Sequence, residues 1–86
     1  MTKDYKHIAE ITNRFKKAIK TLDEDLKKRI SEKIEELLNS KIIGKPLKGK
    51  YKGIEVIRIG KYRLIYSKEP CIIILHDVSH RETAYI

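Results

Sequence analysis

Three arginines in the second half of the chain carry the chemistry that this sequence suggests most directly. Arg58 and Arg63 fall in two short predicted strands joined by a tight turn, and Arg81 follows a third strand. A guanidinium keeps its charge in a protein and needs an anion as its partner, so arginine is poor material for the core of a sheet. Three arginines that neighbouring strands can bring together predict a surface that holds phosphate.

Strand alternation predicts that two of these arginines are direct neighbours. A two-residue turn joins the predicted strands 54–59 and 62–67, and in this register Arg58 lies opposite Arg63. Directly paired residues point to the same face, and like charges there destabilise a sheet, so we interpret the pair as a site for a bridging anion. The alternative is solvation at a sheet edge, or an intramolecular ion pair with one of three carboxylates: Glu55, Asp77 and Glu82.

Other polar groups near the third strand are weaker candidates for chemistry. Tyr85 could stack on a base or transfer a proton, although a lone tyrosine of this kind more often packs. His80 is the histidine next to Arg81, and a surface imidazole is its more common role. His76 and Asp77 end the apolar strand, and we expect one of them to be covered and hydrogen-bonded.

Positive charge is concentrated in one part of the chain. The net charge is +8, and residues 45–63 alone carry seven basic side chains against one acidic side chain. Such a concentration is typical of a protein that binds a polyanion. The alternative is a lysine-rich surface that only keeps the protein soluble. Four of these lysines are candidate contacts to a phosphate backbone: Lys48, Lys50, Lys52 and Lys61.

Length and composition limit the class of protein. A chain of 86 residues is predicted to form one domain, 1–86, with a small core. Its single cysteine, Cys71, excludes an intrachain disulfide and suits a reducing compartment. The longest apolar run, 71–75, is far below the roughly 20 residues that cross a bilayer. Neither the histidine spacing nor any glycine-rich motif predicts a metal or a cofactor. We expect a soluble, cytoplasmic protein.

The first half of the chain predicts two helices. Apolar residues recur at helical spacing after Asn13, which we take as the N-cap of the first helix. A capping box at 21–24 opens the second helix, which ends near Asn39. Its apolar stripe consists of Leu26, Ile30, Ile34, Leu37 and Leu38. Residues 5–11 are ambiguous, because they fit either a short strand or the first turns of the first helix.

The second half predicts strands. Pro46 prevents a helix from continuing, and a glycine-containing loop leads into strand 54–59. Strand 62–67 follows the turn, and strand 71–78 is apolar on both faces, as expected of a central strand. The predicted fold class is α+β: a small, antiparallel-dominated sheet of about four strands, with the N-terminal αα-hairpin packed on one face.

The order of these pieces resembles the RelE/ParE superfamily of small toxins. The resemblance is carried by P-L-K-G at 46–49, R-I-G-K-Y-R-L-I-Y at 58–66 and H-R-E-T-A-Y at 80–85. It covers most of the chain and is tightest over 45–85. It also favours a short first strand, and not a helical start, at residues 5–11. The resemblance implies a RelE-like fold and a ribosome-dependent endoribonuclease, or mRNA interferase. Such toxins enter the ribosomal A site, cut the bound mRNA without a metal, and are neutralised by a cognate antitoxin.

The resemblance also implies roles for individual residues. Arg63 and Arg81 match arginines of the catalytic set, and Arg58 matches a basic residue of the preceding strand. Tyr85 matches the aromatic residue that stacks on or activates the substrate. The remaining candidates would contact RNA or the ribosome: Lys48, Lys50, Lys52, Lys61 and His80.

One position departs from the family pattern and keeps two alternatives open. Many members carry a second basic residue two positions before the strand arginine, and here that position is Val56. Lys50 or Lys52 could substitute from the preceding loop. The alternatives are a ParE-like toxin that inhibits gyrase, and a module that binds RNA or a partner but has lost its catalysis.

Overall fold

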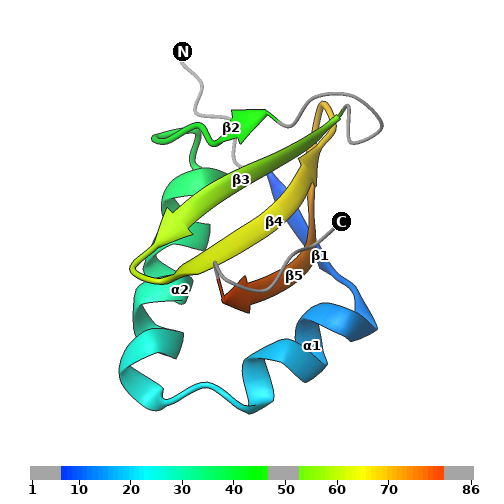
Figure 1. Cartoon of the computed structure of the whole chain (residues 1–86). Coiled ribbons are helices and arrows are strands. Elements are labelled where there is room, and N and C mark those ends of the chain that lie inside the picture. Colours follow the sequence, from blue (N-terminus) through cyan, green and yellow to red (C-terminus); the bar gives the residue numbers. More distant parts are fainter. Residues whose placement is uncertain (1–6, 47–52, 81–86) are drawn as a thin grey trace.

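The computed structural model describes residues 7–46 and 53–80, which form two helices and a five-stranded sheet (Figure 1). This confirms the predicted α+β class, with one strand more than expected. No helix in these two ranges is long and apolar enough to cross a membrane. The elements, in chain order, are β1 (Ile8–Ile11), α1 (Asn13–Lys20), α2 (Glu24–Leu38), β2 (Lys45–Pro46), β3 (Ile54–Ile59), β4 (Tyr62–Lys68) and β5 (Ile72–His80).

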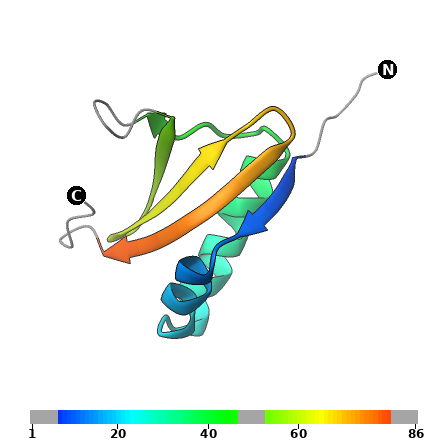
Figure 2. The same ribbon diagram turned by 90° about the vertical axis from the view of Figure 1, so that its right-hand side faces the viewer.

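The sheet is antiparallel except at one edge. The strand order is β1-β5-β4-β3-β2, and only β1 runs parallel to its neighbour, β5. The chain between these two parallel strands includes both helices, which lie on one side of the sheet (Figure 2), and then the three strands β2, β3 and β4. The prediction of a strand in 5–11 is thereby confirmed for Ile8–Ile11. Pairing with β5 decides the ambiguity, because it supplies hydrogen bonds that a helical start would not make with β5.

The core lies between the helices and the sheet. Phe15 on α1 and Ile30 on α2 are each only 1% exposed, and Leu64 on β4 is fully buried. Alternate residues of each strand face this core, as expected for a sheet with one covered face. The buried core cluster comprises Phe15, Ile30, Leu37, Leu38, Ile57, Ile59, Leu64, Tyr66, Ile73, Leu75 and Val78.

The N-caps of both helices differ from those predicted. Thr12, and not Asn13, caps α1 by accepting a hydrogen bond from the Phe15 N–H at 3.1 Å. Asp23 caps α2 by accepting from the Leu26 N–H at 2.8 Å, whereas Thr21 is the C-cap of α1. All four residues are of types that are common at helix ends, so tertiary contacts choose among neighbours. The predicted end of α2 at Asn39 is confirmed.

The short strand β2 replaces part of the predicted loop. Lys45 pairs with Val56, and Pro46 pairs with Glu55. Proline lacks a backbone N–H and is tolerated here because β2 is the edge of the sheet. The segment before β2 is held by the Gly44 N–H, which donates to the Tyr66 hydroxyl at 2.9 Å.

Tyr66 of β4 links β3 and the segment before β2 through its hydroxyl group. The buried phenol accepts from the Gly44 N–H and donates to the Glu55 carboxylate. Burial, and then the hydrogen bond to Glu55, raise the pKa of Tyr66 well above its ordinary value. The phenol therefore stays protonated near neutral pH and acts as a structural donor.

Candidate functional site

The predicted pairing of Arg58 with Arg63 is confirmed by the register of β3 and β4. Their strand neighbours Ile57, Ile59 and Leu64 belong to the core cluster, so alternation points the two arginines away from the helices. We call this side of the sheet the outer face. Arg58 is exposed and Arg63 is half-buried. Two guanidinium groups thus come from directly paired positions on a face without helices.

Two of the three carboxylates considered as partners of this pair bind other groups. Glu55 accepts a hydrogen bond from Tyr66, which lies in the core cluster on the helix side. Asp77 forms an ion pair with Arg14 of α1, with 3.3 Å between Asp77 Oδ2 and Arg14 Nε. The third carboxylate, Glu82, lies outside the described residues. Both described carboxylates therefore have recorded partners elsewhere, and Arg63 has an interaction of its own within the protein.

Lys45 is a further basic residue of the outer face, in a segment where no strand was predicted. Its partner Val56 shares a face with Arg58, two residues further along β3, so Lys45 lies on the same face. The exposed lysine stands beside the valine that departs from the family pattern. Lys45 therefore supplies a cation at this position from a neighbouring strand. The sequence did not predict β2, because proline, the next residue, is unfavourable in most strands.

A groove of about 270 Å³ runs along the edge of β3 next to Lys45. Three cations, from α2, β2 and β3, line it together with apolar side chains. The lining residues are Lys33, Ile42, Ile43, Gly44, Lys45, Val56, Ile57 and Arg58. Ile43 is 76% exposed, so the groove combines an apolar surface with positive charge.

Two further predicted site residues lie in the turn after β3 and at the end of β5. Lys61 is exposed in the turn between β3 and β4, where Gly60 adopts a φ of +61°. His80 pairs with Tyr62, whose ring packs against the core, so His80 lies on the helix side of the sheet. The two rings meet edge to face with centroids 5.2 Å apart. His80 therefore does not face the side that carries Arg58 and Arg63.

The remaining predicted site residues lie outside the described residues and comprise Arg81, Tyr85, Lys48, Lys50 and Lys52. Their roles remain those implied by the sequence.

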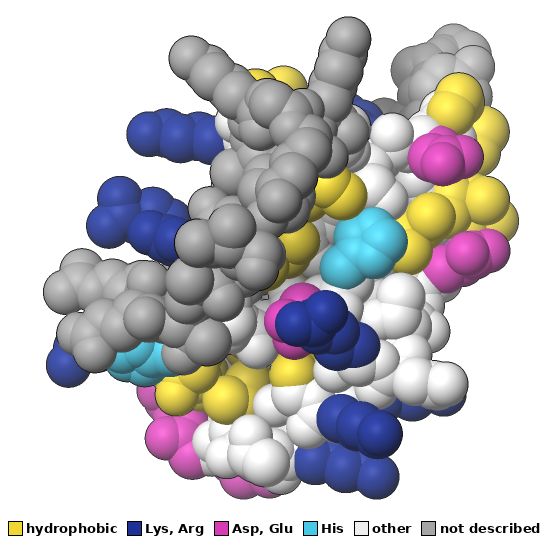
Figure 3. Space-filling model, turned by 45° about the vertical axis from the view of Figure 1, so that its right-hand side comes forward, with side chains coloured by type: hydrophobic (Ala, Val, Ile, Leu, Met, Phe, Trp, Pro, Cys, Tyr) yellow, Lys and Arg dark blue, Asp and Glu magenta, His cyan; other side chains and the backbone are white. Residues whose placement is uncertain are grey.

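A hydrogen-bonded histidine and serine also lie on the outer face. His76 Nε2 is 2.9 Å from Ser67 Oγ. The prediction that His76 or Asp77 is covered and hydrogen-bonded is confirmed for both, since each is half-buried. In Figure 3, histidine, acidic and basic side chains adjoin one another on this side of the molecule. Sequence reasoning did not connect His76 with Ser67, because a bulge in β5 brings them together.

The chain matches one family model almost completely. The family is described as the ParE toxin of the type II toxin–antitoxin system, parDE, and the match covers residues 2–85. No curated protein matches the chain in sequence.

Solved structures of toxins with their antitoxins have a similar fold. The RelBE2 toxin–antitoxin complex of Mycobacterium tuberculosis has a TM-score of 0.79 at 22% identity, covering 88% of this chain and 99% of that chain. The RelB–RelE complex of Methanococcus jannaschii has a TM-score of 0.72 at 32% identity, covering 85% and 91%. The Escherichia coli DinJ–YafQ complex has a TM-score of 0.78 at 14% identity, covering 94% and 99%.

Proposed function

Because the chain belongs to the ParE toxin family of type II toxin–antitoxin systems, within the RelE/ParE superfamily, we propose that it cleaves mRNA in the ribosomal A site without a metal ion. The observation that carries this proposal is the Arg58–Arg63 pair on the outer face. Paired positions on neighbouring strands put the two arginines on the same face, where like charges favour a bound anion. A phosphodiester of single-stranded RNA supplies that anion.

The chemistry explains why arginine suits this task. In RNA cleavage the 2′-hydroxyl attacks the adjacent phosphorus while the bond to the 5′-oxygen breaks. Negative charge collects on the phosphoryl oxygens in the transition state, and preorganised cations stabilise it there. Arg58 and Arg63 fill this role in our scheme, joined by Arg81. Tyr85 then stacks on a base or transfers a proton, as the family resemblance implies.

Lysines of the basic segment 45–63 would hold the RNA backbone and the ribosome. Lys45 stands beside Val56 and compensates for the missing basic side chain on β3. A lysine acts on a phosphate as a point charge, which adds affinity without selecting a sequence. The proposed contacts are Lys45, Lys48, Lys50, Lys52 and Lys61, whereas His80 faces the helix side at the end of β5 and is not part of this set.

The proposed activity predicts a specific pattern of damage in a translating extract. Addition of the purified protein should arrest protein synthesis and leave mRNA cut within the A-site codon. The same mRNA without ribosomes should stay intact, because few acid–base groups are available and the ribosome has to position the substrate. Primer extension on mRNA recovered from the extract locates the cuts. Intact mRNA in the arrested extract would contradict the proposal.

A second candidate function is the inhibition of DNA gyrase. The observation in its favour is the family model itself, which is described as the ParE toxin. A supercoiling assay with purified gyrase distinguishes the candidates. Loss of supercoiling with uncut mRNA would favour the gyrase inhibitor. If neither target is affected, a binding module without catalysis becomes the best description.

We further propose that a cognate antitoxin covers part of the basic surface. The M. jannaschii and E. coli structures similar to this chain are antitoxin–toxin complexes. Residues 45–63 carry seven basic side chains against one acidic side chain, so an acidic segment of the antitoxin complements them.

Binding of the antitoxin should therefore depend strongly on salt. We expect the dissociation constant to rise at least tenfold between about 0.1 and 1 M salt, because screening shortens the Debye length from about 10 Å to about 3 Å. Lys45→Glu should weaken binding more than Lys17→Glu, a matched charge reversal on α1. Isothermal titration calorimetry measures both effects. An affinity that is independent of salt would indicate a purely apolar contact.

A further inference from the structure

Ser79 is a hydroxyl-bearing residue beside the arginine pair that the proposed cleavage does not yet use. Ser79 on β5 pairs directly with Arg63 on β4, and Arg63 pairs directly with Arg58 on β3. Directly paired residues point to the same face of a sheet. Val78, the residue before Ser79, belongs to the core cluster, so Ser79 itself lies on the outer face. One row across three strands therefore carries two arginines and a serine.

The hydroxyl of Ser79 lacks the partner that a covered polar group normally has. Its Oγ atom is buried, and residues 7–46 and 53–80 provide no hydrogen bond to it. Buried polar side chains are nearly always hydrogen-bonded, because a missing hydrogen bond leaves the cost of desolvation uncompensated. Ser67, on the same face of the sheet, has such a partner, since its Oγ lies 2.9 Å from His76 Nε2. The exception at Ser79 thus occurs at the position next to Arg63.

The pairing of Ser79 with Arg63 brings the hydroxyl within reach of an anion held by that arginine. The Cβ atoms of directly paired residues lie about 4.5–5.5 Å apart. Rotation about the Cα–Cβ bond moves Oγ among three staggered positions, so the hydroxyl can turn toward such an anion without a change in the backbone. Serine is a common donor to phosphate oxygens. It also adds a donor without a third positive charge, so it does not increase the repulsion between the arginines.

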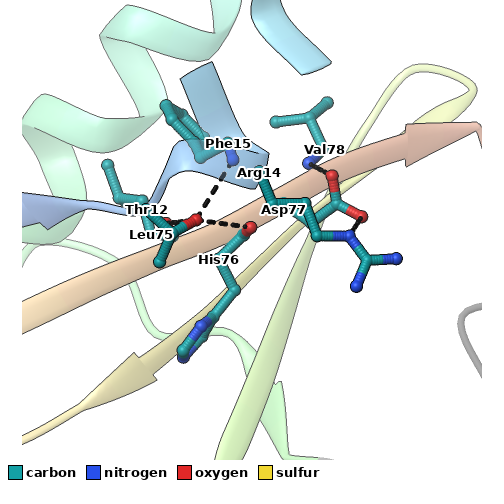
Figure 4. Close-up of polar contacts among 7 residues, drawn as sticks. All are labelled: Thr12, Arg14, Phe15, Leu75, His76, Asp77 and Val78. Atoms are coloured by element: carbon teal, nitrogen blue, oxygen red, sulfur yellow. Dashed lines mark hydrogen bonds and ion pairs between the residues drawn. The ribbon is translucent and has the colours of Figure 1, made fainter. Parts of the chain in front are cut away.

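The part of β5 that leads to Ser79 is anchored from the side of the helices. The Thr12 hydroxyl, just before α1, lies 3.2 Å from the carbonyl oxygen of Leu75 and 3.0 Å from that of His76. Figure 4 shows these contacts along the strand. A fixed strand places the Ser79 hydroxyl before the substrate arrives, so little reorganisation is needed during the reaction.

A carboxylate on the same face has its charge offset by an ion pair. Asp77, two residues before Ser79, lies opposite Ile65 on the outer face, and its negative charge would repel a phosphate. Arg14 Nε lies 3.3 Å from Asp77 Oδ2, and the Val78 N–H donates to Asp77 Oδ1 at 2.8 Å (Figure 4). The bound arginine therefore reduces this repulsion next to the row that carries Ser79.

We propose that Ser79 is a third ligand of the scissile phosphate, an inference that rests on the proposed function. Its hydroxyl donates a hydrogen bond to a non-bridging oxygen of the phosphodiester, while Arg58 and Arg63 balance the charge. A hydrogen bond strengthens as negative charge collects on its acceptor, so Ser79 stabilises the transition state more than the bound substrate. Ser79 transfers no proton and forms no covalent bond in the reaction.

Ser79→Ala tests the inference because it removes one hydroxyl group and keeps the strand. We expect single-turnover cleavage on ribosomes to fall by about 10–100-fold, the usual effect of one hydrogen bond to a charged group. Ser79→Thr keeps the hydroxyl and should retain most of the activity. Ser67→Ala is the matched control, since it makes the same change on the same face, four residues from Arg63 along β4. It should cleave as the wild type does.

A phosphorothioate substrate distinguishes a contact with the phosphate from a loss of structure. Sulfur accepts a hydrogen bond more weakly than oxygen, so sulfur in place of the oxygen that faces Ser79 should slow cleavage by the wild type. In Ser79→Ala the same substrate should be slowed much less, because the hydrogen bond is already absent. Both diastereomers are compared, since only one places sulfur toward Ser79. Equal effects on the wild type and the variant with both diastereomers would overturn the inference.

Binding of inorganic phosphate separates this inference from the proposed function. At constant ionic strength, phosphate should raise the melting temperature of the wild type, and the dissociation constant from this shift should be about tenfold higher in Ser79→Ala than in Ser67→Ala. Wild-type protein that leaves mRNA intact but binds phosphate through Ser79 overturns the cleavage reaction and supports the phosphate contact.

A folded Ser79→Ala with wild-type cleavage and wild-type phosphate binding overturns the inference, while loss of activity in Arg63→Ala still supports the cleavage reaction. If Ser79→Ala does not fold, Ser79→Cys decides, because a thiol fills similar space and is only a weak donor. A reduced cleavage rate in Ser79→Cys supports the contact, and an unchanged rate overturns it.

Discussion

Replacing Arg63 with alanine is expected to lower mRNA cleavage by about two to three orders of magnitude, as does removal of one preorganised transition-state donor in other enzymes. We expect the same of Arg81→Ala. The physical reason is that a fixed guanidinium stabilises the charge that develops on the phosphoryl oxygens. In the alanine variant only water is left to stabilise this charge. Single-turnover kinetics on programmed ribosomes measures the loss.

Stability should change little in Arg63→Ala, because the side chain lies on the outer face and not in the core cluster. Arg29→Ala is the matched control, since Arg29 is exposed on α2 and its guanidinium lies on the helix side, near Gly60. It should cleave as the wild type does. Folded Arg63→Ala and Arg81→Ala proteins with full activity would show that the arginines are structural. The binding module without catalysis would then become the preferred function.

Gly44→Ala is expected to destabilise the protein by about 1–3 kcal/mol, the usual cost of overpacking. A Cβ at this position would lie 2.7 Å from the Tyr66 hydroxyl oxygen and 2.8 Å from the carbonyl oxygen of Val56. The carbonyl belongs to Val56 of β3, which pairs with β2. Moving it away from the new Cβ would disrupt the pairing of β2 with β3. Thermal denaturation measures the effect, at about 4–8 °C for each kcal/mol in a domain of this size.

A double-mutant cycle identifies which of the two contacts matters. In a Tyr66→Phe background the hydroxyl is gone, so Gly44→Ala should cost less than in the wild type if the phenol dominates. An equal cost in both backgrounds would assign the strain to the Val56 carbonyl. Gly44→Ala should also reduce antitoxin or ribosome binding, because the Gly44–Tyr66 hydrogen bond sets the position of Lys45. A variant as stable as the wild type would contradict the clash.

The elements defined by local patterns were predicted well. The apolar stripe of α2 and the alternation of β3 and β4 repeat within a few residues, so each window of sequence carries the whole signal. The Arg58–Arg63 pair belongs to this group, because a two-residue turn sets the register of a hairpin. Helix caps were less certain, since Thr12 and Asn13 are both good N-cap residues and only the contacts of Thr12 with β5 distinguish them.

What the sequence determined by itself was the α+β class, the charge of residues 45–63 and the paired arginines of the hairpin. The tertiary structure alone decided that Lys45 stands beside Val56, that His80 faces the helix side, and that His76 meets Ser67. The physical reason is that these neighbours depend on pairing between distant strands and on a bulge. One extra residue in β5 reverses the side to which the next residues point, and no local pattern specifies which strand will pair with it.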